Sequence, residues 1–63
     1  MTNLSGKTVV IVGLGESGIA AAELARRHGA EVVANDAASL EALSPRARAL
    51  SGRGVRLEVG GHP

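Results

Sequence analysis

The sequence has 63 residues, nine of them glycine, and contains no cysteine and no phenylalanine, tyrosine or tryptophan. A disulfide scaffold is therefore excluded, and a structural zinc site is disfavoured because thiolate ligands are missing. Hydrophobic residues make up 44% and charged residues 21%, which is typical of a folded protein rather than a disordered tail. Because globular domains usually have about 100–150 residues, the length indicates part of a larger domain.

The formal net charge is +1, and the basic residues are scattered rather than clustered. With no aromatic side chains for base stacking, this pattern argues against a nucleic-acid partner. The first residues lack the basic and apolar regions of a signal peptide, and no stretch approaches the roughly 20 apolar residues that span a bilayer. We therefore expect a cytoplasmic protein with no membrane partner. Four arginines are expected to form a solvated face: Arg46, Arg48, Arg53 and Arg56.

The first predicted element is a strand over 8–12, an unbroken apolar run typical of a parallel strand that is covered on both faces. A helix is expected from about Ser17 to His28, with Glu23 and Arg27 at a spacing that favours an ion pair. Ile19 falls among its polar positions. The apolar side of this helix is predicted to comprise Ala20, Ala21, Leu24, Ala25 and His28.

Further elements follow in alternation. A second strand is predicted over 31–36, a short helix over 44–51 with a serine cap and a proline at its start, and a third strand over 55–59. Residues 60–63 are expected to form a turn. The order β-α-β-α-β predicts an α/β fold with a parallel sheet and right-handed crossovers. This is a Rossmann-like arrangement, the first half of a doubly wound nucleotide-binding domain.

A glycine motif connects the first strand to the first helix. Residues 13–18 match the pattern G-x-G-x-x-G, and Asp36 lies 18 residues after Gly18, near the spacing of about 20 that is typical of nucleotide-binding folds. Gly13 permits the turn, Gly15 lets a phosphate approach the backbone, and Gly18 lets the helix pack closely on the strand. The N–H groups at the helix start would then face the ligand. Alternatively, the glycines serve only a tight packing turn.

Several polar residues near this motif have two possible roles. Asp36 could accept a hydrogen bond from a ribose hydroxyl or a base N–H, or be a solvated loop residue that starts the next turn. Ser17 could donate its hydroxyl to a phosphate or begin the helix. Glu16 would repel a diphosphate if it pointed inward, so we expect it to turn outward or contact a sugar or base. His28 is expected to be a helix-terminal residue, and neither a catalytic constellation nor a metal site is predicted.

Residues 6–18, the strand that ends at Asp36, and the later Gly60-Gly61-His62 resemble the amino terminus of the Mur ligases, in particular those that add D-glutamate to UDP-N-acetylmuramoyl-L-alanine in peptidoglycan synthesis. The distinctive part is G-L-G-x-S-G after G-K-x-V-V-I-V. The resemblance runs from about Ser5 to His62. It implies that residues 1–63 are part of an amino-terminal, Rossmann-like domain that binds the UDP part of the substrate. The central ATPase domain and the carboxyl-terminal domain would then lie outside this sequence.

The resemblance also implies roles for particular residues. The turn would face the diphosphate through Gly15, Glu16, Ser17 and Gly18, and Asp36 with the backbone of Ala37 would contact the uracil end. The family often has a polar or basic residue after that aspartate, whereas this sequence has alanine, so only backbone contacts are expected there. No catalytic residue, metal or cofactor is expected in this segment. ATP, Mg²⁺ and D-glutamate are implied for the other domains of a monomeric full-length enzyme.

The glycine motif alone does not separate the Mur ligases from other nucleotide-binding proteins. One alternative is the NAD-binding half-domain of an oxidoreductase, in which Asp36 would bind the adenosine ribose. Another is a nucleotide-sensing module without catalytic activity. Nothing in these residues can carry out a reaction unaided. For a piece of this size, binding and orientation of a nucleotide is the function that the sequence predicts.

Overall fold

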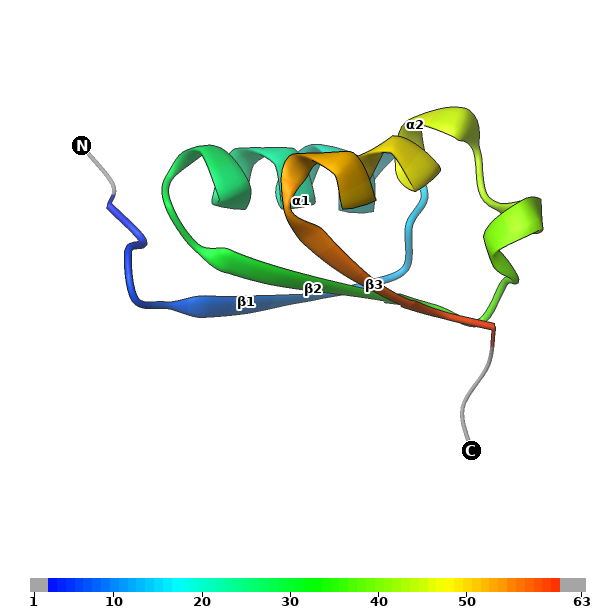
Figure 1. Ribbon diagram of the computed structural model, residues 1–63, viewed down its shortest axis with the longest axis horizontal. Helices are drawn as coiled ribbons and strands as arrows, with labels where there is room; N and C mark the ends of the chain where they lie inside the picture. The colour runs from blue at the N-terminus through cyan, green and yellow to red at the C-terminus, as the bar shows by residue number, and fades with distance from the viewer. Residues whose placement is uncertain (1–2, 61–63) are drawn as a thin grey trace.

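The computed structural model describes residues 3–60, in which helices pack against one face of a three-stranded sheet (Figure 1). The strands are parallel and lie in the order β1-β2-β3. This confirms the predicted β-α-β-α-β arrangement. The final residues of the expected terminal turn, 61–63, lie outside the described part of the chain. The elements in chain order are β1 (Thr8–Val12), α1 (Glu16–Arg27), β2 (Glu31–Asp36), the 3-10 helix η1 (Leu40–Ala42), α2 (Pro45–Ala49), the 3-10 helix η2 (Leu50–Arg53) and β3 (Val55–Val59).

The strand register separates the side chains into two sets. Val9 is paired with Val32, and Val32 with Val55, so these positions share the face that the helices cover. The alternate positions share the opposite face. The core lies between the sheet and the helices, and its most buried members are Leu14, Ile19, Ala22, Ala25, Ala30, Val32, Ala34, Leu43, Ala47, Leu50 and Val55.

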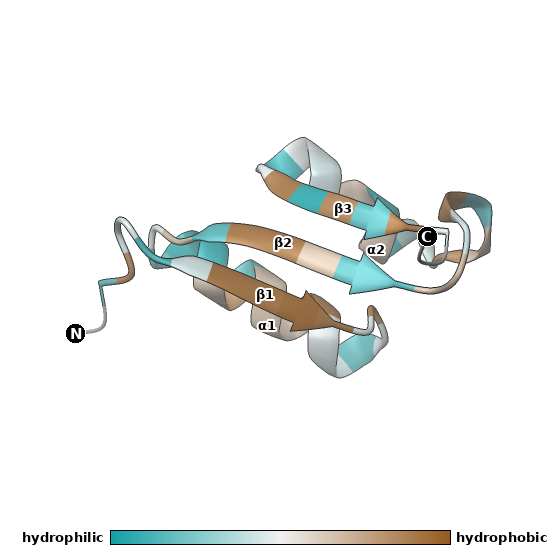
Figure 2. Cartoon of the chain, turned by 90° about the horizontal axis from the view of Figure 1, so that it is seen from below, coloured by the Kyte–Doolittle hydropathy of each residue, from teal (hydrophilic) through white to brown (hydrophobic). Residues whose placement is uncertain are grey.

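The opposite face of the sheet carries no helix within residues 3–60. Figure 2 views the sheet from this side and shows that most residues of β1 are hydrophobic. Val10 is 57% exposed and Val12 is 83% exposed. The expectation that β1 is covered on both faces is therefore wrong for the described residues. The physical reason is that both crossovers are made in the same direction along the sheet, which places both helices on one side.

The buried side of α1 also differs from the prediction. Ile19, Ala22 and Ala25 are its buried residues, whereas Ala20, Ala21 and Leu24 are exposed. The close approach of Gly18 to the carbonyl group of Gly13 sets the rotation of the helix. That contact directs positions 19, 22 and 25 at the sheet. Alanine occurs on several sides of this helix, so the positions of the alanines alone do not define which side is buried.

The second helical segment starts as predicted and ends differently. The Ser44 hydroxyl accepts a hydrogen bond from the Ala47 N–H at 3.2 Å, and Pro45 is the first helical residue. The α-helical part is short and continues as η2 to Arg53, followed by Gly54 with φ +88°, so the segment extends beyond the predicted end at residue 51. Ala47 and Leu50 are buried against the core. Their burial anchors this segment beside α1.

Candidate functional site

The turn between β1 and α1 depends on two glycines. Gly13 has φ +92°, a conformation that favours glycine, and its N–H donates to the Asn35 carbonyl oxygen at 2.8 Å. A Cβ atom on Gly18 would overlap the carbonyl oxygen of Gly13. The predicted roles of these residues in the turn and in close packing are confirmed. Gly15 differs from both, because a Cβ atom there would meet no heavy atom within 4 Å.

Helix α1 begins directly at this turn. Gly15 is its N-cap, and the Gly15 carbonyl oxygen accepts a hydrogen bond from the Ile19 N–H at 2.9 Å. Glu16 and Ser17 are thus already helical, and the alternative that Ser17 begins the helix is wrong by one residue. The first N–H groups of a helix have no acceptor within it, and they carry the positive end of the helix dipole. The open side of Gly15 lies next to these groups.

Asp36 connects the turn to the loop that follows β2. Its Oδ2 accepts a hydrogen bond from the Leu14 N–H at 2.7 Å, and its Oδ1 accepts one from the Ala38 N–H at 2.9 Å. The two bonds, led by that from Ala38, hold the pKa of the Asp36 carboxyl below its ordinary value of 3.8, although desolvation partly opposes this shift. Asp36 is therefore an ionised tie between two loops, and its bond to Ala38, two residues on, also starts the turn after β2, as the alternative role expected.

A pocket of about 310 Å³ lies at the carboxyl ends of β1 and β2. It includes two of the predicted site residues, Asp36 and Ala37. The four predicted residues of the turn, 15–18, do not line it but lie in the adjoining segment. The full lining is Val12, Gly13, Asn35, Asp36 and Ala37. The structure thus places the two groups of predicted residues at the same edge of the sheet, which is where open parallel sheets bind ligands.

Asn35 is a pocket residue that the sequence reasoning missed. It is paired in register with Val12, so it lies on the face of the sheet opposite to that of Ala34 and the helices. The signal was present in the order of residues in the second strand, since one polar amide follows a run of small apolar residues. The amide offers both a donor and an acceptor to a bound group.

The Glu16 carboxylate is directed towards α2. Its Oε1 lies 3.3 Å from Nη1 of Arg46, and its side chain is 88% exposed. This confirms the expectation that Glu16 turns outward. Arg46 also lies 3.5 Å from Glu23, which in turn pairs with Arg53 at 3.5 Å. Glu23 thus pairs across helices rather than with Arg27 of its own helix, and the supposed solvated arginine face is partly an inter-helix contact.

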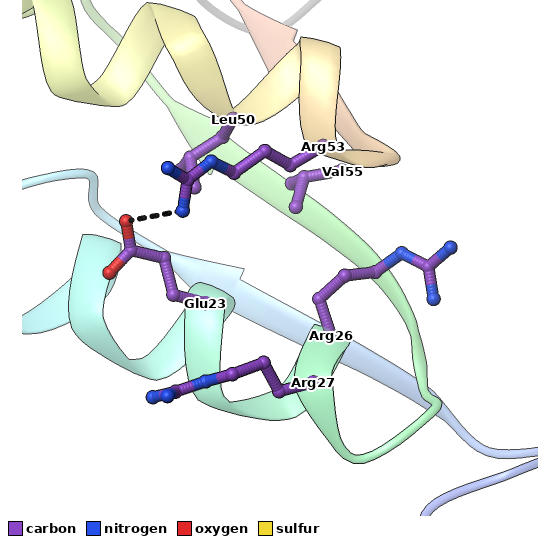
Figure 3. A pocket seen from close by; sticks show the side chains of 6 residues that line it. All are labelled: Glu23, Arg26, Arg27, Leu50, Arg53 and Val55. Atoms are coloured by element: carbon purple, nitrogen blue, oxygen red, sulfur yellow. Dashed lines mark ion pairs between the residues drawn. The ribbon is translucent and has the colours of Figure 1, made fainter.

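A second pocket, of about 370 Å³, lies near the other end of the sheet, between α1, η2 and the start of β3 (Figure 3). Three arginines contribute to its lining, and Arg53 pairs there with Glu23. Arg26 donates a hydrogen bond from Nη1 to the Ala30 carbonyl oxygen at 3.4 Å. The residues that line this pocket are Glu23, Arg26, Arg27, Leu50, Arg53 and Val55.

Neither a metal-binding cluster nor a membrane-spanning helix is present in the described part of the chain. Within residues 3–60, no three or more histidine, cysteine, aspartate or glutamate side chains are grouped so that they could hold a metal ion. None of the described helices combines the length and the apolar character needed to cross a membrane. The candidate site is thus made of a backbone turn, one carboxylate, one amide and small side chains.

The fold and the site together define a class. A parallel β-α-β-α-β unit with a glycine turn at the start of its first helix is a Rossmann-like half-domain, and folds of this class bind nucleotides at the carboxyl ends of their strands. No family model matches the chain. Comparison with curated proteins nevertheless finds relatives that carry the name UDP-N-acetylmuramoylalanine--D-glutamate ligase.

These relatives match nearly the whole chain. The ligase of Acidobacterium capsulatum is 52% identical over 59 residues, which is 94% of this chain. That of Shouchella clausii is 47% identical over 60 residues, and that of Streptococcus thermophilus is 41% identical over all 63. The chain spans only 13–14% of the length of these proteins. It is therefore similar to their amino-terminal part, and the resemblance expected from its motifs is confirmed.

Proposed function

We propose that this chain is the amino-terminal part of a ligase that adds D-glutamate to UDP-N-acetylmuramoyl-L-alanine, and that it binds the UDP part of that substrate. The observation that carries the proposal is the identity of 41–52% with ligases of that name over nearly the whole chain. Peptidoglycan synthesis in the cytoplasm is the role that follows. D-Glutamate, ATP and Mg²⁺ are assigned to parts of the ligase outside these residues.

The diphosphate is proposed to lie against the start of α1. There the first N–H groups of the helix and the positive end of its dipole favour an anion. The open space at Gly15 supports this placement, because a side chain at that position would fill the approach to the backbone. Ser17 and Gly18 follow within the first turn of the helix. The Ser17 hydroxyl is proposed to donate a hydrogen bond to a phosphate oxygen.

The uracil end is proposed to occupy the pocket between β1 and β2. Asp36 fixes the backbone on both sides of this pocket, since it binds Leu14 on one side and Ala38 on the other. The Ala38 carbonyl oxygen accepts a further hydrogen bond from Gly60, which ties the same loop to the end of β3. The backbone of Ala37 is thereby held at the pocket. Remote binding of the nucleotide would position the reacting carboxylate of the substrate.

Calorimetric titration of the full-length protein tests this proposal. UDP-N-acetylmuramoyl-L-alanine and UDP are expected to bind saturably, and NAD is expected to give no response. Saturable binding of NAD without a response to the UDP compounds would overturn the proposal in favour of an oxidoreductase half-domain or a nucleotide-sensing module.

A pair of matched variants tests where the diphosphate binds. Gly15→Leu places a side chain in the open space beside the helix start, so we expect UDP affinity to fall by at least about tenfold with the fold retained. Gly52→Leu is the control, because a Cβ atom there also meets nothing within 4 Å, and it lies in η2. Titration with UDP, together with circular dichroism for the fold, measures both. Equal affinity in the two variants would contradict the placement.

A further inference from the structure

Arg46 lies between two carboxylates of α1. Its Nη1 is 3.3 Å from Glu16 and its Nη2 is 3.5 Å from Glu23. The two glutamates are seven residues apart, about two helical turns, so they share one side of α1. Arg46 itself belongs to α2, one residue before the fully buried Ala47. The burial of Ala47 fixes the position from which the guanidinium group reaches α1.

Glu16 presents an electrostatic problem for the proposed ligand. It is the first residue of α1, in the segment proposed to hold the diphosphate. A carboxylate there would repel the phosphate groups, and it would also cancel part of the attraction of the helix start. Arg46 opposes both effects, because it draws the carboxylate towards α2 and neutralises its charge.

We propose that Arg46 is a positioning residue for diphosphate binding, which acts by holding and neutralising Glu16. This role rests on the proposed function, since it requires an anion at the start of α1. The pair itself is exposed, at 60% for Arg46 and 88% for Glu16, so it adds little to the stability of the fold. Its loss is therefore expected to change ligand affinity without unfolding the protein.

A purely structural role of Arg46 predicts a different result. Arg46 and Arg53 both pair with Glu23, so both could simply fasten the second helical segment to α1. Only Arg46 also contacts Glu16. Arg53 has a similar exposure, 68%, and is thus a matched control for the helix contact without the contact to the turn.

The test is a double-mutant cycle in the full-length protein, with UDP and UDP-N-acetylmuramoyl-L-alanine as probes. Arg46→Gln is expected to weaken the affinity by about fivefold at low salt, and less at high salt because the charges are then screened. Glu16→Gln removes the charge that Arg46 controls, so adding Arg46→Gln in that background is expected to change affinity by less than about twofold. Arg53→Gln is expected to leave affinity unchanged. The change should be seen in the KM for the UDP substrate rather than in kcat.

Three results would overturn the inference. An equal effect of Arg46→Gln in both backgrounds would mean that Arg46 acts independently of Glu16. An equal loss in Arg53→Gln would mean that only the contact between helices matters. Unchanged UDP affinity in Arg46→Gln would mean that Arg46 has no role in binding. Failure of the proposed function is recognised separately, because then the unsubstituted protein itself would not bind the UDP compounds.

Discussion

The two ends of the sheet carry pockets of similar size that are built in different ways. At the carboxyl end, main-chain groups and one carboxylate define the pocket, and hydrogen bonds of 2.7–2.9 Å join the turn after β1 to the loop after β2. At the amino end, arginine side chains define the pocket, with ion pairs and hydrogen bonds of 3.4–3.5 Å. The larger and more basic pocket is thus the one whose polar lining consists mainly of exposed side chains rather than main-chain groups.

On the proposed placement of the nucleotide at the carboxyl end, positive charge alone is a poor guide to the anion site. The arginines at the amino end are long, exposed side chains, and fixing them around a ligand costs conformational entropy. The start of α1 offers N–H groups that the fold already holds in place, so less entropy is lost when an anion binds there. The carboxyl end is accordingly the site that we propose for the nucleotide.

The largest effect is expected from Gly18→Ala at the carboxyl end. Its methyl group would overlap the backbone carbonyl of Gly13, and a backbone atom cannot rotate away, so we expect a loss of about 3 kcal/mol in the free energy of unfolding. Thermal unfolding of the full chain measures it. The comparison at the amino end is Gly54→Ala, where the neighbour is the flexible Arg26 side chain and the cost of φ +88° is about 1 kcal/mol. A larger loss of stability in Gly54→Ala than in Gly18→Ala would contradict the difference between the two ends of the sheet.

An intermediate effect is expected from Asp36. In Asp36→Asn, the amide nitrogen cannot accept a hydrogen bond, so one of the N–H groups of Leu14 and Ala38 loses its acceptor, and UDP affinity should fall by about tenfold. Calorimetric titration with UDP at neutral pH measures the loss. An unchanged affinity would show that this tie between the loops is not needed for binding.

The ionisation of the Asp36 carboxylate can be followed through the two backbone N–H groups that it binds. Because the pKa of the Asp36 carboxyl is lowered, the stability that this carboxylate contributes is fully present above pH 3.8. It is lost as the pH falls through the lowered pKa. The amide resonances of Leu14 and Ala38 in nuclear magnetic resonance spectra should therefore shift together, with a common midpoint below 3.8. Separate midpoints, or a midpoint at or above 3.8, would contradict the arrangement.

The smallest effect is expected from Arg53→Gln at the amino end. The ion pair with Glu23 is 3.5 Å long and its arginine is 68% exposed, so its loss should change the free energy of unfolding by less than about 0.5 kcal/mol. Chemical denaturation of the full chain measures this value. A large loss of stability, or a loss of UDP affinity, would show that the arginine pocket is organised more tightly than its contacts indicate.

The elements of the fold could be predicted because local signals agree along the chain. The apolar run of β1, the Ser44-Pro45 start of α2 and the glycines of the first turn each fix backbone structure within a few residues. The buried face of α1 could not be derived in the same way. Its rotation depends on the contact between Gly18 and Gly13, which is a three-dimensional constraint.

The candidate site could be predicted only in part, because it too depends on contacts between residues that are far apart in the sequence. Spacing in the sequence drew attention to Asp36, but the two N–H groups that it binds come from separate loops, and one of them lies 22 residues away. The pair of Glu16 and Arg46 joins residues 30 positions apart. Exposed charged residues that are this far apart in the sequence leave no periodic pattern from which their pairing could be predicted. Their partners become visible only once the second helical segment is placed beside the first.

Strand β1, at the edge of the sheet, affects how the isolated segment is expected to behave in solution. Within residues 3–60, its outer edge pairs with no other strand, and its five residues carry no charge. An uncharged edge next to exposed valines is a template on which another strand can add by main-chain hydrogen bonds. In a preparation of this segment alone, two copies present the same template to each other. Self-association through β1 is therefore the expected failure of the isolated segment, and a lysine in place of Val12 is the substitution that opposes it.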